Sequence, residues 1–133
     1  MAGLVYLDAS AIVKLVVEES ESQALRAALR NRPDRVSSAI SLVEVRLAAD
    51  RRSPAPPPGR VSTILAGLTL IPVDHPTLER ASRFGKHAVR ALDAIHLATA
   101  QSLGGDLGSF IAYDHRLLTA AHQLRGLSTE EPR

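Results

Sequence analysis

The sequence predicts an α/β domain in which helices cover both faces of a central parallel sheet. Short apolar runs alternate with segments of helical periodicity along the 133 residues, which is the pattern of repeated strand–helix units. The first run, residues 3–7, is continuously apolar, as expected for a strand buried on both faces. A chain of this length corresponds to one domain, so we expect residues 1–133 to fold as a single unit.

Two strands and three helices are predicted before the middle of the chain. The first strand ends at Asp8, and both Asp8 and Ser10 are suitable N-caps for the helix that follows. Ser41 is a suitable N-cap for the third helix, with Glu44 three residues later as its capping-box partner. The expected strands are 3–7 and 36–40, and the expected helices are 10–19, 21–32 and 41–52.

A proline-rich segment, residues 53–59, divides the chain. It is incompatible with a helix interior or a central strand, so we expect a stiff, extended loop. Beyond it, the expected strands are 68–73 and 109–113, and the expected helices are 60–67, 75–87, 92–105 and 114–125. The polar tail, residues 128–133, is expected to be loose.

The composition excludes several classes of protein. The absence of cysteine rules out a disulfide scaffold, a zinc ribbon and a thiol nucleophile. Aromatic residues make up only 3% of the chain, which argues against a platform for stacked bases. No segment reads as a signal peptide or a membrane span, so we expect a cytoplasmic protein without a membrane partner.

Two acidic residues directly follow predicted strands. Asp8 follows strand 3–7 and Asp114 follows strand 109–113, which places both at the carboxyl edge of the sheet, where open α/β sheets bind ligands. Each residue also precedes a predicted helix. N-capping is therefore an alternative role for either carboxylate.

Two further acidic residues lie in apolar surroundings. Asp93 is near the start of a helix that carries no other charged residue through Leu103, so its carboxylate is expected beside buried surface. Glu44 has apolar residues four positions before it and three and four positions after it in its helix. The capping-box role explains one hydrogen bond of Glu44 but not this apolar face.

One arrangement accounts for all four acids. If the first and fourth strands are adjacent, Asp8 and Asp114 project from the same edge, and the helices that carry the other two acids can close over them. Four carboxylates at close range repel one another unless cations neutralise them. Oxygen ligands without cysteine suit Mg²⁺ or Mn²⁺, and such ions activate water and polarise a phosphodiester.

The charge balance is compatible with a nucleic-acid substrate. The net charge is +2, but setting the four acids aside leaves ten acids against 16 basic residues, so the remaining surface carries about +6. Several basic residues, near the site or flanking the proline-rich loop, are candidates for binding an RNA backbone, with an ordinary solvated surface as the alternative. These candidates are Lys14, Arg46, Arg51, Arg52 and Arg116.

Four segments of the sequence together resemble the signature segments of PIN domains. They are YLDASAIVK at 6–14, SLVEVR at 41–46, ALDAIHLATA at 91–100 and FIAYDHRL at 110–117. The resemblance extends in order over nearly the whole chain. It is strongest to the VapC-type toxin ribonucleases of bacterial toxin–antitoxin pairs.

The resemblance implies a three-layer α/β/α sandwich with a parallel sheet of four to five strands, the fifth near Leu127. It implies an Mg²⁺- or Mn²⁺-dependent endoribonuclease, the toxin of a toxin–antitoxin pair, which inhibits translation and growth. It also implies a cognate VapB-type antitoxin and a homodimer. By position, the family's catalytic and metal-binding acids fall on Asp8, Glu44, Asp93 and Asp114. The resemblance also implies that the Ser10 hydroxyl supports these acids without itself binding the metal.

One position departs from the family pattern. Two residues before the fourth acid, where the family often has Thr or Ser, this chain has Ala112. Asp114 is therefore either a direct metal ligand or only a helix cap. His96, one helical turn after Asp93, is either a contact of the site or a structural histidine.

Two other functions are compatible with parts of the pattern. A catalytically weak PIN-like module that binds RNA or a partner is one alternative, and the missing hydroxyl at Ala112 favours it. An aspartyl phosphotransferase of the haloacid dehalogenase type, with Asp8 as nucleophile, is another. Such enzymes usually carry a second Asp two residues later, where this chain has Ser10.

Overall fold

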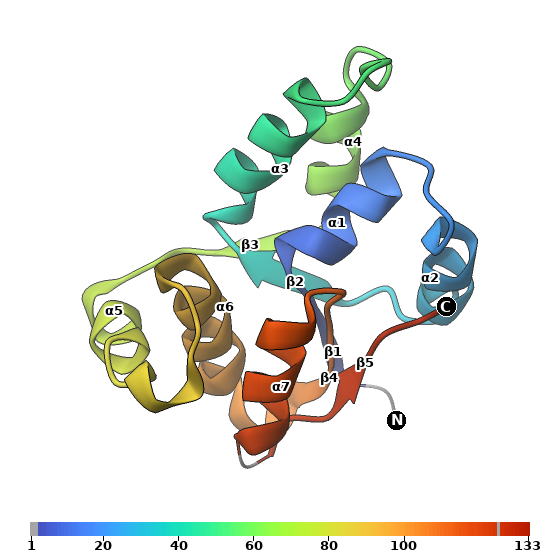
Figure 1. Ribbon diagram of the computed structural model, residues 1–133. Coiled ribbons are helices and arrows are strands. Elements are labelled where there is room, and N and C mark those ends of the chain that lie inside the picture. Colours follow the sequence, from blue (N-terminus) through green and yellow to red (C-terminus); the bar gives the residue numbers. More distant parts are fainter. Residues whose placement is uncertain (1–2, 125) are drawn as a thin grey trace.

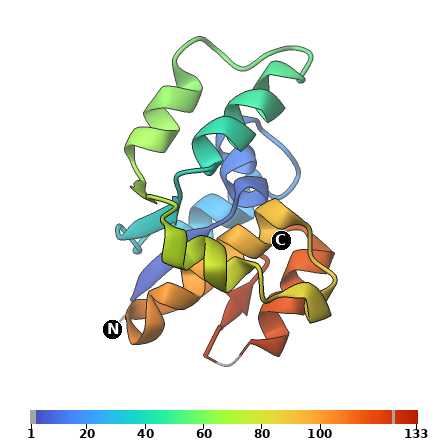
Figure 2. The same ribbon diagram turned by 90° about the vertical axis from the view of Figure 1, so that its left-hand side faces the viewer.

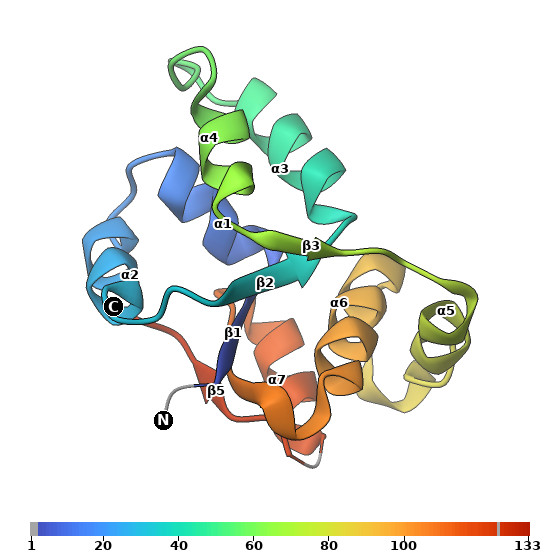
Figure 3. The ribbon, with the colours of Figure 1, turned by 180° about the vertical axis from the view of Figure 1, so that it is seen from behind.

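The apolar run near the N-terminus forms the central strand of the structure, a computed structural model that describes residues 3–124 and 126–133. This strand, β1 (Leu4–Leu7), is almost fully buried and lies in a five-stranded, fully parallel sheet of order β3-β2-β1-β4-β5 (Figures 1 and 3). The other strands are β2 (Arg35–Ser38), β3 (Thr69–Ile71), β4 (Leu107–Ile111) and β5 (Thr129–Glu130). The predicted parallel α/β sheet is confirmed.

Seven α-helices cover the two faces of this sheet in the described part of the chain (Figures 1 and 2). On one face lie α1 (Ala9–Val16), α2 (Ser22–Leu29), α3 (Ser41–Asp50) and α4 (Arg60–Ala66); on the other lie α5 (His75–Ala81), α6 (Ala91–Ser102) and α7 (His115–Gln123). The predicted three-layer sandwich is therefore confirmed. Within residues 3–124 and 126–133, no helix is both long and apolar enough to cross a membrane.

Successive residues of β1 supply the two cores of the molecule, because side chains alternate across a strand. Tyr6 packs with α6, α7 and Phe110 on one face. Val5 and Leu7 pack with α1, α2 and α3 on the other. This double burial explains why the run is continuously apolar.

The register between β1 and β4 brings the two predicted strand-end acids to one edge. Leu7 pairs with Ile111, and the backbone N–H of Asp8 donates to the carbonyl of Ile111 over 3.2 Å. The adjacency of the first and fourth strands is thus confirmed. Asp8 and Asp114 both follow strands that end side by side.

Several predicted boundaries are wrong, including those of the fourth strand and of the helix expected at 75–87. The fourth strand occupies Leu107–Ile111 instead of 109–113, because Gly108 interrupts the apolar pattern at its start. The predicted helix 75–87 ends at Ala81 and is followed by a separate 3-10 turn, Gly85–His87. Residue 125, the last of the predicted final helix, lies outside the described residues.

The proposed capping box at the start of α3 is also wrong. The helix is capped by Ile40, without a side-chain hydrogen bond. The hydroxyl of Ser41 is buried and lies 2.7 Å from the hydroxyl of Ser37 in β2. Glu44 is therefore not occupied by the helix terminus and is available for another role.

The C-terminal tail is ordered, in contrast to the loose segment expected at 128–133. Thr129 and Glu130 pair with β4 as β5, close to the fifth strand expected near Leu127. Glu130 accepts from Arg32 over 2.6 Å, and the Tyr113 hydroxyl donates to the carbonyl of Pro132 over 2.7 Å. Polar contacts hold the tail, so an apolar pattern could not reveal it.

The start of β4 depends on a close approach of two glycines. A Cβ at Gly108 would lie 2.9 Å from the backbone nitrogen of Gly3, which no real Cβ tolerates. We expect Gly108→Ala to lower the free energy of unfolding by about 2 kcal/mol, measured by urea denaturation, because the strands must separate. Gly85→Ala is the control, since nothing lies within 4 Å of its Cβ position; an equal loss there would contradict this explanation.

Candidate active site

Asp8 is held at the end of β1 by its own local bonds. Its side chain is 4% exposed and caps α1, accepting from the Ala11 backbone N–H over 3.1 Å and from the Ser10 hydroxyl over 2.6 Å. Burial raises the pKa of Asp8 to about 6, although its hydrogen bonds from Ser10 and Ala11 oppose the shift. A buried carboxylate with a raised pKa gains most from a neighbouring cation.

Ser10 joins the two loops that leave β1 and β4. Its hydroxyl donates to Asp8 and accepts from the backbone N–H of Tyr113 over 2.9 Å. Tyr113 directly precedes Asp114. The hydroxyl expected to assist the first acid therefore also fixes the position of the loop that carries the fourth.

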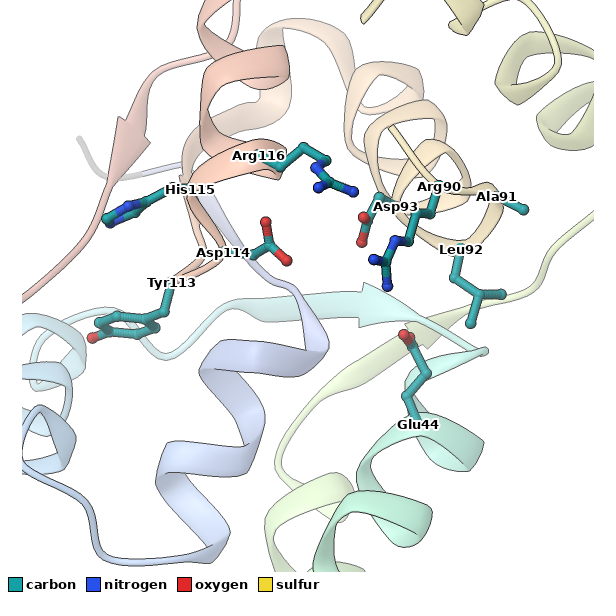
Figure 4. Close-up of a pocket in the computed structure, with 9 residues that line it drawn as sticks. All are labelled: Glu44, Arg90, Ala91, Leu92, Asp93, Tyr113, Asp114, His115 and Arg116. Carbon is teal, nitrogen blue, oxygen red and sulfur yellow. The ribbon is translucent and has the colours of Figure 1, made fainter. Parts of the chain in front are cut away.

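A cavity of about 810 Å³ opens at this edge of the sheet. Three of the predicted acids line it: Glu44 from α3, Asp93 from α6 and Asp114 from the loop before α7 (Figure 4). Asp93 and Asp114 face each other, and Glu44 points toward the same space from the opposite side. The fourth acid, Asp8, is buried near them but does not line the cavity.

The electrostatics of Asp93 show that these groups interact. Burial raises the pKa of the half-buried Asp93 carboxyl, and the charges of Asp114 and Glu44 raise it further. The positive charge of Arg90 acts in the opposite direction. The repulsion expected among the four acids is thus present in part, because their charges influence one another.

Glu44 is bound by a buried histidine. Nε2 of His96 lies 2.7 Å from Oε1 of Glu44, and the histidine side chain is 1% exposed. His96 therefore combines the two roles considered for it, since it is a core residue and also contacts the site.

Asp114 has two functions in the structure. One of its oxygens caps α7 by accepting from the Leu117 backbone N–H over 3.1 Å, while its side chain lines the cavity. Ala112 is fully buried in the core beside α7. The cap that the sequence offered as an alternative is therefore real, and it leaves the second carboxylate oxygen of Asp114 for a ligand.

The donor set fits a hard divalent cation. All four predicted ligands offer carboxylate oxygens, and burial or mutual repulsion raises the pKa of Asp8 and Asp93. As the side chains stand, no three acidic or histidine residues among 3–124 and 126–133 lie close enough together to hold a metal. To bind one ion together, these carboxylates would have to draw closer.

Two arginines flank the acids in the cavity. Arg116, predicted as an RNA contact, lies on the first turn of α7, and Arg90 precedes α6 (Figure 4). Arg90 was missed in the sequence. Its signal is a cation at a helix N-terminus, where the helix dipole disfavours positive charge.

The other predicted RNA contacts lie outside this cavity. Lys14 is bound by Glu19 and Glu21 over 3.2 and 2.7 Å, and Arg52 also pairs with Glu19. The remaining two lie along α3: Arg46 donates to Ser62 over 2.9 Å, and Arg51 lines a groove of about 390 Å³ beside Glu44. Carboxylates thus already neutralise Lys14 and Arg52.

The fold and cavity define an α/β protein with a carboxylate-lined site at the carboxyl edge of its sheet. The model of the family "PIN domain" matches residues 5–123. The chain therefore belongs to the PIN-domain family.

Curated relatives place the chain near the VapC proteins. It is 50% identical over 121 residues to Ribonuclease VapC46 of Mycobacterium tuberculosis (strain ATCC 25618 / H37Rv), covering 90% of this chain and 92% of that protein. It is 39% identical over 125 residues to Ribonuclease VapC35 of the same strain, covering 91% and 92%. These identities extend over nearly the full length of both partners.

Solved structures share the fold at low sequence identity. The crystal structure of Mycobacterium tuberculosis VapC20, described as a sarcin–ricin loop cleaving toxin, has a TM-score of 0.74 and 16% identity, covering 96% of this chain and 99% of that one. A toxin–antitoxin complex from Klebsiella pneumoniae has a TM-score of 0.72 and 22% identity, covering 96% and 98%. The α/β/α arrangement is thus common to all three.

Proposed function

We propose that this chain is an endoribonuclease that hydrolyses RNA phosphodiester bonds with the help of Mg²⁺ or Mn²⁺. The observation that carries the proposal is the convergence of three acids on one cavity, with a fourth buried beside them. The 50% identity to Ribonuclease VapC46 supports RNA as the substrate. The metal ligands would be drawn from Asp8, Glu44, Asp93 and Asp114.

Each element of the site has a task in this chemistry. A bound ion would supply an activated water and neutralise charge on the phosphate that is attacked. Ser10 holds Asp8 and the Tyr113 backbone in place, so that the first and fourth acids keep their spacing. Arg90 and Arg116 place positive charge where the RNA backbone would enter.

We further propose that the protein acts in the cytoplasm as a toxin that inhibits translation and growth. It would form a homodimer and bind a VapB-type antitoxin. The structural similarity to a toxin–antitoxin complex supports the antitoxin. Large apolar side chains are exposed near the cavity, which suits contacts with protein partners. They are Leu42, Val43 and Leu47 on α3, with Leu92 on α6.

The phosphotransferase alternative receives no support from the geometry. A nucleophilic Asp8 would need access to a phosphate, but its side chain is 4% exposed and one of its oxygens accepts two hydrogen bonds. The binding-module alternative makes a different prediction from the nuclease, because such a module needs no metal.

Metal removal separates the nuclease from the binding module. We expect the purified protein to cleave total cellular RNA in Mg²⁺ or Mn²⁺, to lose this activity in EDTA, and to regain it when excess Mn²⁺ is added, because the bound ion would supply the activated water. Cleavage is followed by gel electrophoresis. RNA binding without cleavage under all three conditions would favour the module.

Arg90 and Arg116 are expected to contribute binding and not chemistry. We expect Arg90→Gln or Arg116→Gln to raise KM for RNA and to reduce the slope of log affinity against log salt by about 1, because each removes one phosphate contact. Fluorescence anisotropy with a labelled RNA at several salt concentrations measures this slope. Arg30→Gln, on the exposed end of α2, is the control; an equal effect there would indicate a general charge effect.

A further inference from the structure

His96 lies between the site and the core of the molecule. It is on α6, one helical turn after Asp93, and its side chain is 1% exposed. Nδ1 lies 2.7 Å from the Tyr6 hydroxyl, and Nε2 lies 2.7 Å from Oε1 of Glu44. A buried chain of three side chains therefore links β1, α6 and α3, and it ends at an acid of the cavity.

With a neutral imidazole, one arrangement of protons satisfies both hydrogen bonds of His96. A carboxylate only accepts hydrogen bonds, so Nε2 of His96 carries the proton that it donates to Glu44. In a neutral imidazole Nδ1 is then an acceptor, and the Tyr6 hydroxyl donates to it. Burial raises the pKa of Tyr6 above its ordinary range, so this hydroxyl keeps its proton.

Tyr6 is itself held by close packing. It is fully buried in the central strand, and its ring stacks on Phe110 with 5.3 Å between centroids and 7° between planes. Its ring also meets that of His96 edge to face, 5.8 Å away. The imidazole is therefore fixed both by packing and by a bond at the nitrogen that faces away from Glu44.

We propose that His96 is a positioning residue: it donates from Nε2 to one oxygen of Glu44, and the Tyr6 hydroxyl holds it in the tautomer that does so. Oε2, which this bond leaves unused, is then directed to the metal ligand set. Nothing in this role requires His96 to touch RNA or the ion. The inference rests on the proposed function, because it assigns Glu44 to metal binding.

The proton arrangement is tested first, without metal. Long-range ¹⁵N–¹H NMR of the protein labelled with ¹⁵N-histidine, at pH 7.5 in EDTA, reports which ring nitrogen is protonated. The His96 signals are assigned by their loss in His96→Gln. We expect a protonated Nε2, a bare Nδ1, and a changed Nε2 signal in Glu44→Ala; a protonated Nδ1 would overturn the inference.

Metal affinity is tested next, by calorimetric titration with Mn²⁺. We expect His96→Ala to weaken Mn²⁺ binding by about 10- to 100-fold, as is typical when a residue that orients a ligand is removed. His96→Gln should recover most of this loss, because its amide can donate to Glu44. Tyr6→Phe, which keeps the ring and removes the hydroxyl, should weaken binding by about 5-fold, the equivalent of one hydrogen bond.

Comparison of these variants separates positioning from a purely structural role. A structural role predicts a lower unfolding temperature but unchanged Mn²⁺ affinity and kcat in the folded protein. We expect kcat for RNA cleavage to fall with Mn²⁺ affinity while KM for RNA stays constant. His75→Ala, on the exposed face of α5, is the matched control and should bind Mn²⁺ like the wild type.

The outcomes also separate this inference from the proposed function. If the wild type binds Mn²⁺ and cleaves RNA but folded His96→Ala does so equally well, the inference fails and the proposed function stands. If the wild type neither binds Mn²⁺ nor cleaves RNA, the proposed function fails, and the positioning role of His96 fails with the proposed function.

Discussion

We expect Asp93→Asn to lower the rate of RNA cleavage by at least about 100-fold, more than the loss of a residue that only orients a ligand. The substitution keeps the size of the side chain but removes the charge that would hold a cation between α6 and Asp114. Folding should not suffer, because burial and neighbouring acids already disfavour the charged form of Asp93. Single-turnover cleavage of a labelled RNA in Mn²⁺ measures the rate.

The matched control is Asp106→Asn. Asp106 is exposed in the 3-10 turn before β4, at the opposite edge of the sheet. Its substitution should therefore leave the rate of RNA cleavage unchanged. Equal activity in wild type and Asp93→Asn would contradict the assignment of the cavity. Equal losses in both variants would indicate that the substitutions act through general charge.

The second large effect concerns Asp8 and stability. Burial raises its pKa from 3.8 to about 6, so the fold favours the protonated form. In the metal-free protein, the stability gained from this shift is fully present below the pKa that Asp8 has in the unfolded chain. It is lost as the pH rises through 6. The loss amounts to about 3 kcal/mol at pH 8, from a shift of about two pKa units.

Asp8→Asn should therefore be more stable than the wild type at pH 8 in EDTA, by up to about 3 kcal/mol, and similar to it at pH 4. Asn is also a good N-cap, so α1 should remain intact. Urea denaturation at both pH values measures the difference. Mn²⁺ added at pH 8 should narrow it, because an ion that binds only the folded wild type stabilises it.

Asp74→Asn provides a control of opposite sign. Asp74 caps α5, and hydrogen bonds from Thr77 lower its pKa, so its contribution is present at pH 8 and is lost as pH falls through its folded value. This variant should gain no stability at pH 8. A wild type whose stability does not fall between pH 4 and pH 8, relative to Asp8→Asn, would contradict the burial argument.

The central part of the fold could be predicted because its pattern is local and its acids follow strands. Continuous burial of β1 and the strand-end positions of Asp8 and Asp114 follow from sequence order alone. β5 could not be predicted in the same way, since ion pairs such as Arg32–Glu130 join residues distant in the sequence. Gly108 likewise gives no apolar signal, although its lack of a side chain lets β1 and β4 meet.

The site was predictable to a similar extent. The apolar face of Glu44 pointed to a buried partner, but nothing in the sequence showed that the partner is His96, because the two residues meet only through tertiary packing. A capping box was a plausible local role for Glu44. It does not form, because the Ser41 hydroxyl is hydrogen-bonded to Ser37 instead. Arg90 enters the cavity from a loop whose path depends on the 3-10 turn before it.

The most direct test of the metal centre is anomalous diffraction from crystals soaked in Mn²⁺. We expect a manganese peak in the cavity, about 2.0–2.6 Å from carboxylate oxygens of Asp93 and at least one of the other three acids. The same soak of Asp93→Asn crystals should show no such peak. A manganese peak only outside the cavity, or no peak at saturating Mn²⁺, would contradict the assignment of the metal centre to this cavity.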